Sequence, residues 1–241
     1  MRSRIIFLPG LLCDGSVFEP QIRALSRFAD VLVADFSDLD SIEGMAAHAL
    51  ALVEGPITLI GFSMGGRAAL EAYRQVPGRI SYLCLMDTGA VPAREHEAET
   101  RGVLQKLARE EGMKALATKW LPPMLHIDRE TEPGLVEPLV AMVERASVAQ
   151  HDRQIKALLK RPDARPVLPS IACPTLVMVG RQDRWATLAQ HEEMAAAIPG
   201  AELAVIEDAG HFVSVERPEA VTAALMAWLG FGQSQREGSA A

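Results

Sequence analysis

Short apolar segments alternate with amphipathic segments along most of this chain. Six apolar segments predict strands that are covered on both faces, because their hydrophobic residues are mostly continuous rather than alternating with polar ones. They span residues 5–8, 31–34, 57–60, 82–86, 175–179 and 203–206. Amphipathic segments predict helices at residues 18–28, 42–53, 64–75, 188–198 and 218–229. This alternation indicates right-handed crossovers, so the predicted fold class is α/β, with a mostly parallel central sheet flanked by helices.

The alternation stops between residues 91 and 166, where we find no convincing strand. Helical patterns cover about 94–111, 135–147 and 149–159, and a proline-rich stretch then leads back to the next strand. A long helical insertion between two strands predicts a cap, or lid, over the end of the sheet. We expect an α/β core at 1–90 and 167–234, a helical cap at 91–166 and a flexible tail at 235–241.

Composition and charge narrow the possible partners. Apolar residues make up 49% of the 241 residues, which is ordinary for a globular protein. The net charge of −7 argues against a nucleic-acid partner. No window approaches the roughly 18 apolar residues of a membrane span, and Pro9 and Gly10 interrupt the N-terminal apolar run, unlike in a signal peptide. We therefore expect a cytoplasmic monomer or homodimer with no membrane partner.

The three cysteines add no evidence for a bound metal. Cys13, Cys84 and Cys173 lie far apart and show neither disulfide nor metal-ligand spacing. They are expected to be small core residues in a reducing compartment. We expect no metal and no other cofactor.

A serine flanked by glycines stands where the strand at 57–60 passes into the helix at 64–75. The sequence there is GFSMGG, with Ser63 between Gly61 and Gly65. Ligands bind parallel sheets at the carboxyl ends of strands, and glycines leave room for a serine that projects upward from a tight turn. An incidental serine in such a turn is the alternative, but the strand and helix on either side favour a nucleophile.

A serine hydroxyl needs a base that accepts its proton and an acid that orients the base. His211 is the candidate base because it alone among the six histidines lies in a loop directly after a predicted strand. Asp183 and Asp87 both follow strands and lie outside the cap, whereas Asp208 is too close to His211 along the chain. The acid should lie between the serine and the histidine in sequence, at a strand end, and of the two candidates we favour Asp183, which follows the later strand. Asp87 remains the alternative.

These segments together resemble an α/β-hydrolase over nearly the whole chain. The resemblance rests on the turn LPGLLCDGSVF, the GFSMGG segment, the acid loop GRQDRWA and the base loop DAGHFVSVERPEAV. The order serine, acid, histidine is that of the family. Small bacterial carboxylesterases that hydrolyse short esters are the most similar type. One departure is Pro9, which stands where many relatives carry a histidine and which removes one backbone donor from that turn.

The resemblance implies a serine carboxylesterase with no cofactor. Ser63, His211 and Asp183 would cleave carboxylic esters of small to medium acyl chains through an acyl-enzyme. The backbone amides of Met64 and Leu11 would bind the oxyanion, with Leu12 as the alternative to Leu11.

Large apolar residues near these loops and in the cap could line a substrate pocket. The candidates are Leu12, Phe62, Trp120, Leu121, Met124, Trp185 and Phe212. Packing between the cap and the core is the alternative for each cap residue. Arg153, Lys156 and Lys160 share one helical face, which is either solvated or a dock for a carboxylate or a carrier protein.

The substrate cannot be named from a resemblance in fold. The same fold and triad could instead hydrolyse a lactone, a thioester or a C–C bond, or act as a lyase or a perhydrolase. A ligand-binding receptor without turnover is a third possibility, against which the three intact polar residues argue.

Overall fold

Six strands form one parallel sheet in the order β2-β1-β3-β4-β5-β6. The computed structural model describes residues 2–231 of the 241. The strand bounds are β1 Ser3–Leu8, β2 Ala29–Val33, β3 Ile57–Phe62, β4 Ile80–Met86, β5 Thr175–Gly180 and β6 Glu202–Ile206. Every predicted strand overlaps one of these, so the predicted α/β class with a parallel sheet is confirmed.

The position of each strand in the sheet explains its hydrophobic pattern. All residues of β3 and β5 are buried, because helices cover both faces of the sheet. The edge strands β2 and β6 are partly exposed along their length. Coverage of both faces, which was predicted for all six segments, therefore holds for β3 and β5 but is wrong for the edge strands β2 and β6. β3 and β4 bring their carboxyl ends together at the middle of the sheet.

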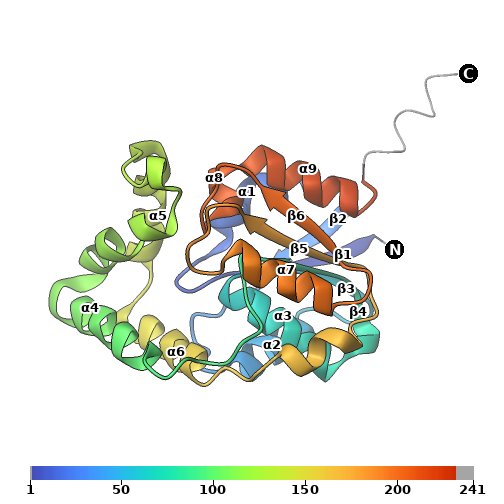
Figure 1. Ribbon diagram of the computed structural model, residues 1–241, viewed down its shortest axis with the longest axis horizontal. Coiled ribbons are helices and arrows are strands. Elements are labelled where there is room, and N and C mark those ends of the chain that lie inside the picture. The colour runs from blue at the N-terminus through green and yellow to red at the C-terminus, as the bar shows by residue number, and fades with distance from the viewer. Residues whose placement is uncertain (1, 232–241) are drawn as a thin grey trace, which may run out of the picture.

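Helices cover both faces of the sheet, as Figure 1 shows. On one face lie α1 Glu19–Leu25, the short α8 Val213–Glu216 and α9 Pro218–Trp228. On the other face lie α2 Ile42–Ala51, α3 Met64–Gln75 and α7 Leu188–Ala197. The predicted helix at 18–28 is shorter than expected: a 3-10 turn at Gly15–Phe18 precedes α1, and residues 26–28 form a turn after it.

A helical insertion separates β4 from β5. It contains α4 Glu97–Trp120, α5 Pro133–Arg145 and α6 Val148–Leu159, which lie together beside the sheet, at the left of Figure 1. The predicted end of the first of these helices near residue 111 agrees with a break at Gly112, where φ is 87° and the backbone leaves the helical conformation. A further helical stretch, which the prediction lacked, follows this kink and continues to Trp120.

Ion pairs join the insertion to the loop after β2. Arg153 donates to Ser37 and pairs with Asp38, and Lys156 pairs with Asp40. Two residues of the predicted charged helical face, Arg153 and Lys156, therefore form ion pairs within the protein. The predicted tail at 235–241 and the end of the predicted core, 232–234, lie outside the described residues. No helix among residues 2–231 combines the length and the apolar character that crossing a bilayer requires.

Candidate active site

Ser63 stands alone between β3 and α3, in a strained backbone conformation. Its φ is 52° and its ψ is −113°, a region that residues with a Cβ atom rarely occupy. The amide of Ser63 donates to the carbonyl of Met86 at 2.9 Å, and its own carbonyl accepts from the Thr88 hydroxyl at 2.6 Å. Because neighbouring elements hold the turn from both sides, the serine hydroxyl is presented at the end of the sheet.

The two glycines beside the serine permit a close approach of backbone to backbone. A Cβ atom at position 65 would lie only 1.9 Å from the carbonyl oxygen of Leu8. A Cβ atom at position 61 would lie 2.6 Å from the carbonyl oxygen of Gly65. Glycine is therefore required at both positions, since any side chain would push α3 away from β1 and β3 and displace Ser63.

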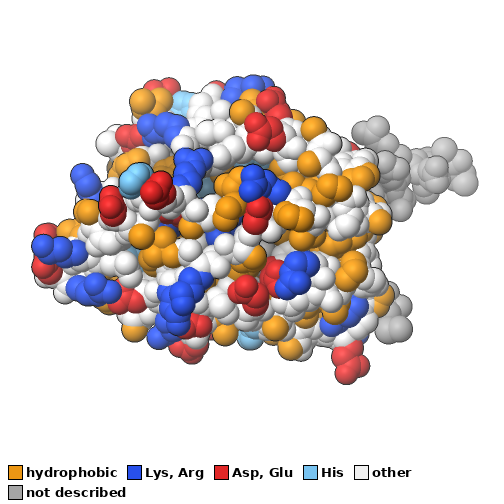
Figure 2. Space-filling model, turned by 60° about the horizontal axis from the view of Figure 1, so that its bottom comes forward, with side chains coloured by type: hydrophobic (Ala, Val, Ile, Leu, Met, Phe, Trp, Pro, Cys, Tyr) orange, Lys and Arg blue, Asp and Glu red, His pale blue; other side chains and the backbone are white. Residues whose placement is uncertain are grey.

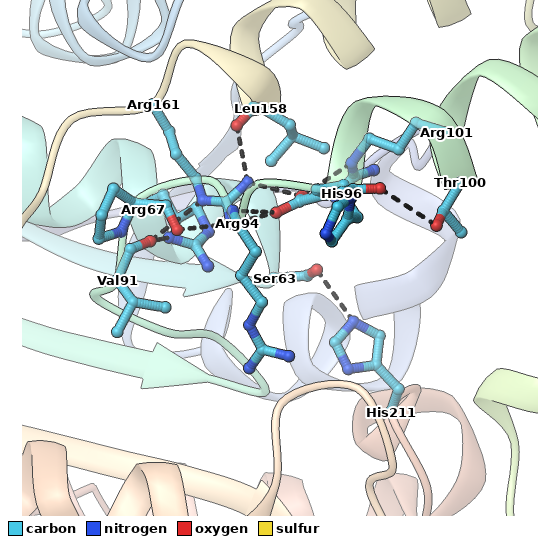
Figure 3. Close-up of polar contacts among 12 residues, drawn as sticks. Ser63, Arg67, Val91, Arg94, His96, Thr100, Arg101, Leu158, Arg161 and His211 are labelled. Carbon is cyan, nitrogen blue, oxygen red and sulfur yellow. Dashed lines mark hydrogen bonds and ion pairs between the residues drawn. The ribbon is translucent and has the colours of Figure 1, made fainter.

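The loops after β5 and β6 bring an aspartate and a histidine to this serine. His211 Nε2 lies 2.9 Å from Ser63 Oγ, and His211 Nδ1 lies 2.7 Å from Asp183 Oδ2 (Figure 3 draws the first contact). Both the histidine and the aspartate are 4% exposed. A carboxylate on Nδ1 holds the proton there and leaves the lone pair of Nε2 directed at the hydroxyl.

Asp183 is held in its ionised form. Its Oδ1 accepts from the amides of Trp185 at 2.7 Å and Ala186 at 3.0 Å. Burial acts to raise the pKa of Asp183, but His211 and these amides outweigh burial and keep the pKa below its ordinary value. The carboxylate is thus charged at neutral pH and fixed in orientation.

Asp87, the alternative acid, is directed elsewhere. Its Oδ1 accepts from the amide of Gly180 at 2.9 Å, and its Oδ2 accepts from the amide of Val213 at 3.2 Å. Burial, followed by the nearby charge of Asp183, raises the pKa of Asp87 well above its usual range. Both oxygens serve the backbone, so the structure brings Asp183 rather than Asp87 to the histidine.

Two backbone amides beside Ser63 have no hydrogen-bond partner among residues 2–231. They belong to Leu11, in the turn after β1, and to Met64, the first residue of α3. The amide of Met64 also lies at the positive end of the helix dipole. Leu12, the alternative donor, is unsuitable because its amide already donates to Gln154 Oε1 at 2.8 Å.

Gln154 of α6 fixes the turn that carries Leu11. Besides accepting from Leu12, it donates through Nε2 to the carbonyl of Phe36 at 3.2 Å, and it is buried. Gln154→Met should lower the free energy of unfolding by about 1–3 kcal/mol, because the buried amide of Leu12 loses its partner, whereas the carbonyl of Phe36 still accepts from the amide of Leu39 at 3.2 Å. Urea denaturation measures this effect, with Gln150→Met on the same helix as the control. Equal midpoints for the two variants would contradict it.

A cavity of about 600 Å³ opens above Ser63, between the core and the insertion. Of the predicted lining residues, Phe62, Trp120, Met124, Trp185 and Phe212 line it, as do both candidate amide-donor residues. Trp185 is 45% exposed and lies at the rim. The other two, Leu12 and Leu121, are not among the residues that line the cavity in the described part of the chain. Both side chains are buried, and Leu12 lies on a turn with a φ of 58°.

Several polar residues of the lining were missed in the sequence. They are Arg67, Arg94, Arg101, His151 and Arg161. Only Arg67 had a local signal, because it lies four residues after Ser63 and so on the same face of α3. His151 is buried and its Nδ1 has no partner within residues 2–231. Burial lowers the pKa of His151 to about 4, so the ring is neutral at pH 7.

The lining provides no clear ligand set for a metal. Within the described part of the chain, no three His, Cys, Asp or Glu side chains are placed to share an ion. Cys13 lines the cavity, but burial raises the pKa of its thiol, so the thiol stays protonated at neutral pH. The nucleophile that the geometry favours is therefore the serine hydroxyl.

Comparisons with known proteins agree with this fold. A family model described as the alpha/beta hydrolase family matches residues 5–224. A thermophilic esterase from Thermogutta terrifontis, solved with malate bound, is 28% identical with a TM-score of 0.86, over 95% of this chain and 89% of that one. The enol-lactonase from Burkholderia xenovorans LB400 is also 28% identical, with a TM-score of 0.85, over 95% of this chain and 92% of that one.

Two curated proteins that are similar in sequence are longer than this chain. The polyketide synthase ThaQ of Burkholderia thailandensis is 30% identical over 94% of this chain but only 12% of the synthase. The 3-oxoadipate enol-lactonase 2 of Acinetobacter baylyi is 30% identical over 70% of this chain and 62% of the lactonase. The chain thus spans a small part of the first protein and less than two thirds of the second.

Proposed function

This chain belongs to the alpha/beta hydrolase family, as its motifs predicted, and we propose that it is a serine carboxylesterase. Its substrates are carboxylic esters of small to medium acyl chains. One observation carries the proposal: Ser63, His211 and Asp183 form a continuous series of hydrogen bonds at the floor of a cavity. A receptor without turnover would not need this arrangement.

The geometry supports nucleophilic attack by the serine. His211 accepts the hydroxyl proton through Nε2 while Ser63 Oγ attacks the acyl carbon. Asp183 stabilises the imidazolium that forms and keeps the ring in place. The amides of Leu11 and Met64 donate to the carbonyl oxygen as it becomes negative, and their pre-set positions lower the barrier.

The second half of the reaction releases the acid. The alcohol leaves with the proton that His211 returns, and the acyl group remains on Ser63. A water molecule then gives a proton to His211 and attacks the acyl carbon. The oxyanion forms again at the same two amides, and Ser63 is restored when the acid departs.

We also propose that residues 91–166 act as a lid on a core of residues 1–90 and 167–234. The insertion supplies Trp120 and Met124 to the apolar part of the cavity, next to Phe212 of the core. A lid that excludes water strengthens the electrostatic interactions inside the site. These apolar side chains favour a short alkyl chain on the acyl group.

A series of p-nitrophenyl esters from acetate to laurate tests the proposed substrate class. We expect the highest kcat/KM for short to medium chains and a value about tenfold lower for laurate, because a long alkyl chain would desolvate charged groups of the lining. A maximum at laurate would contradict the preference. Absence of hydrolysis across the whole series would contradict the esterase proposal.

A second candidate function is hydrolysis of a lactone. Its support is the similarity to two enol-lactonases, each aligned over more than two thirds of this chain. A lactone is a cyclic ester, so the same serine, histidine and amides serve both reactions. Product analysis separates the two, because opening of a lactone yields one hydroxy or keto acid and no released alcohol.

A further inference from the structure

Positive charge gathers inside the cavity of an otherwise acidic protein. The net charge of the chain is −7, and on the face seen in Figure 2 basic and acidic side chains are intermingled. Four arginines line the cavity and form what we call the arginine wall: Arg67, Arg94, Arg101 and Arg161. They come from α3, the loop after β4, α4 and the segment after α6, and Figure 3 shows them beside the Ser63–His211 pair.

Two members of the wall are already neutralised in part by one carboxylate. Arg161 binds Glu97 through two nitrogens at 2.6 and 2.7 Å, and Arg101 binds it at 2.8 Å. Burial opposes ionisation of Glu97, but the hydrogen bonds from Arg161 and Arg101 lower its pKa to about 2. These three residues hold the segment before α4 in place, since Arg161 also donates to the carbonyls of Val91 and Pro92.

Arg67 is a largely buried cation that forms no direct ion pair with a carboxylate among residues 2–231, although the charge of Glu97 lies near enough to favour its protonated form. Its Nη1 donates to the carbonyl of Val91 at 2.8 Å, while Nε and Nη2 make no hydrogen bond within residues 2–231. Burial, followed by the nearby charge of Arg161, lowers the pKa of Arg67 to about 9, so the side chain is still protonated at neutral pH. An unpaired buried charge is costly, and the free Nε–Nη2 edge has the spacing of a carboxylate.

Arg94 offers a second free guanidinium at the mouth of the same cavity. Its side chain forms no hydrogen bond or ion pair with any residue that the structure describes. In Figure 3 the guanidinium extends away from Arg161, to the level of His211. Glu95 is exposed at the rim and pairs with neither Arg67 nor Arg94 among the described contacts. The two free cations therefore lack a counter-ion within residues 2–231.

We propose that Arg67 and Arg94 bind a carboxylate that the substrate carries in addition to its ester. This subsite rests on the proposed function, because it selects among the substrates of Ser63. Arg67 lies in the first turn of α3, where its amide donates to the carbonyl of Ser63 at 3.4 Å, and both side chains line the same cavity. The bound carboxylate is thus a few bonds from the scissile carbonyl, and the preferred substrates are half-esters of short dicarboxylic acids.

Matched ester pairs test the subsite. We compare kcat/KM for the monomethyl esters of glutaric and adipic acid with the values for methyl pentanoate and methyl hexanoate, which lack the second carboxylate. The wild-type protein should prefer each half-ester by about tenfold or more. Arg67→Met/Arg94→Met should lose this preference. Arg109→Met, which removes an arginine of α4 that does not line the cavity, should keep it.

Binding to the Ser63→Ala variant separates this inference from the proposed function. Calorimetry should detect the half-ester but not the neutral ester, and the signal should vanish when both arginines are replaced. Hydrolysis of both ester types at equal rates, or a preference that survives in the double variant, would overturn the subsite and leave the esterase proposal standing. Binding of the half-ester without hydrolysis would overturn the esterase proposal alone. If the half-ester is neither bound nor hydrolysed, both the carboxylate subsite and the esterase proposal are overturned.

Discussion

Ser63→Ala is expected to lower kcat for the preferred p-nitrophenyl ester by about 10⁶-fold, the scale of loss known for the serine of a catalytic triad. Ser63 Oγ lies 2.9 Å from His211 Nε2 and is the atom that forms the acyl-enzyme in the proposed mechanism. Alanine keeps the Cβ atom and removes only this oxygen. The activity that remains in the variant is the rate acceleration that substrate binding and the amides of Leu11 and Met64 supply without a nucleophile.

The fold should survive this change. The turn is held by the Ser63 amide and carbonyl, which bond to Met86 and Thr88 and do not involve the hydroxyl. Thermal melting should therefore stay close to that of the wild-type protein. Ser26→Ala, at an exposed serine far along the chain, is the matched control and should keep full activity.

Covalent labelling identifies the nucleophile independently of turnover. A fluorophosphonate should modify the wild-type protein at Ser63, and peptide mass mapping should find no label in the Ser63→Ala variant. Activity that persists in that variant would refute the proposed mechanism. Labelling of another residue in the wild-type protein would refute it as well.

Local sequence patterns predicted the parts of the site that lie at strand ends. Ser63 directly follows an apolar run and His211 lies in the loop after one, and a parallel sheet places such residues at one edge. The glycines at 61 and 65 indicate that the backbones of the strand and the helix lie close together, which any strand-to-helix turn of this kind requires. The approximate positions of the helices and strands could be predicted as well, because the spacing of apolar residues along the chain is also a local pattern.

Other features depend on contacts between distant segments, which no local pattern reveals. Asp87 and Asp183 both follow strands, and only their hydrogen-bond partners distinguish them. The amide of Leu12 is engaged by Gln154, which lies in a different helix more than a hundred residues away. Arg94 and Arg161 occur in segments with no recognisable motif, and they line the same cavity only because the insertion folds back over the sheet.

Exchange of the two aspartates, one at a time, should separate orientation of the base from support of the fold. Asp183→Asn is expected to lower kcat by about 10⁴-fold. An amide NH₂ next to His211 Nδ1 favours the tautomer that carries its proton on Nε2, and that nitrogen then cannot accept from Ser63. The loss should appear in kcat over the whole pH range in which the enzyme is folded.

Asp87→Asn should affect stability instead. Both oxygens of Asp87 accept from backbone amides, and an NH₂ group cannot accept, so either Gly180 or Val213 loses its partner. The expected cost is about 1–3 kcal/mol in the free energy of unfolding, with kcat within about tenfold of wild type. Urea denaturation and ester hydrolysis, measured on both variants, give the two quantities. If Asp87→Asn removed activity and Asp183→Asn did not, the acid would be Asp87, and the hydrogen bond between Asp183 and His211 would not be the one that the reaction uses.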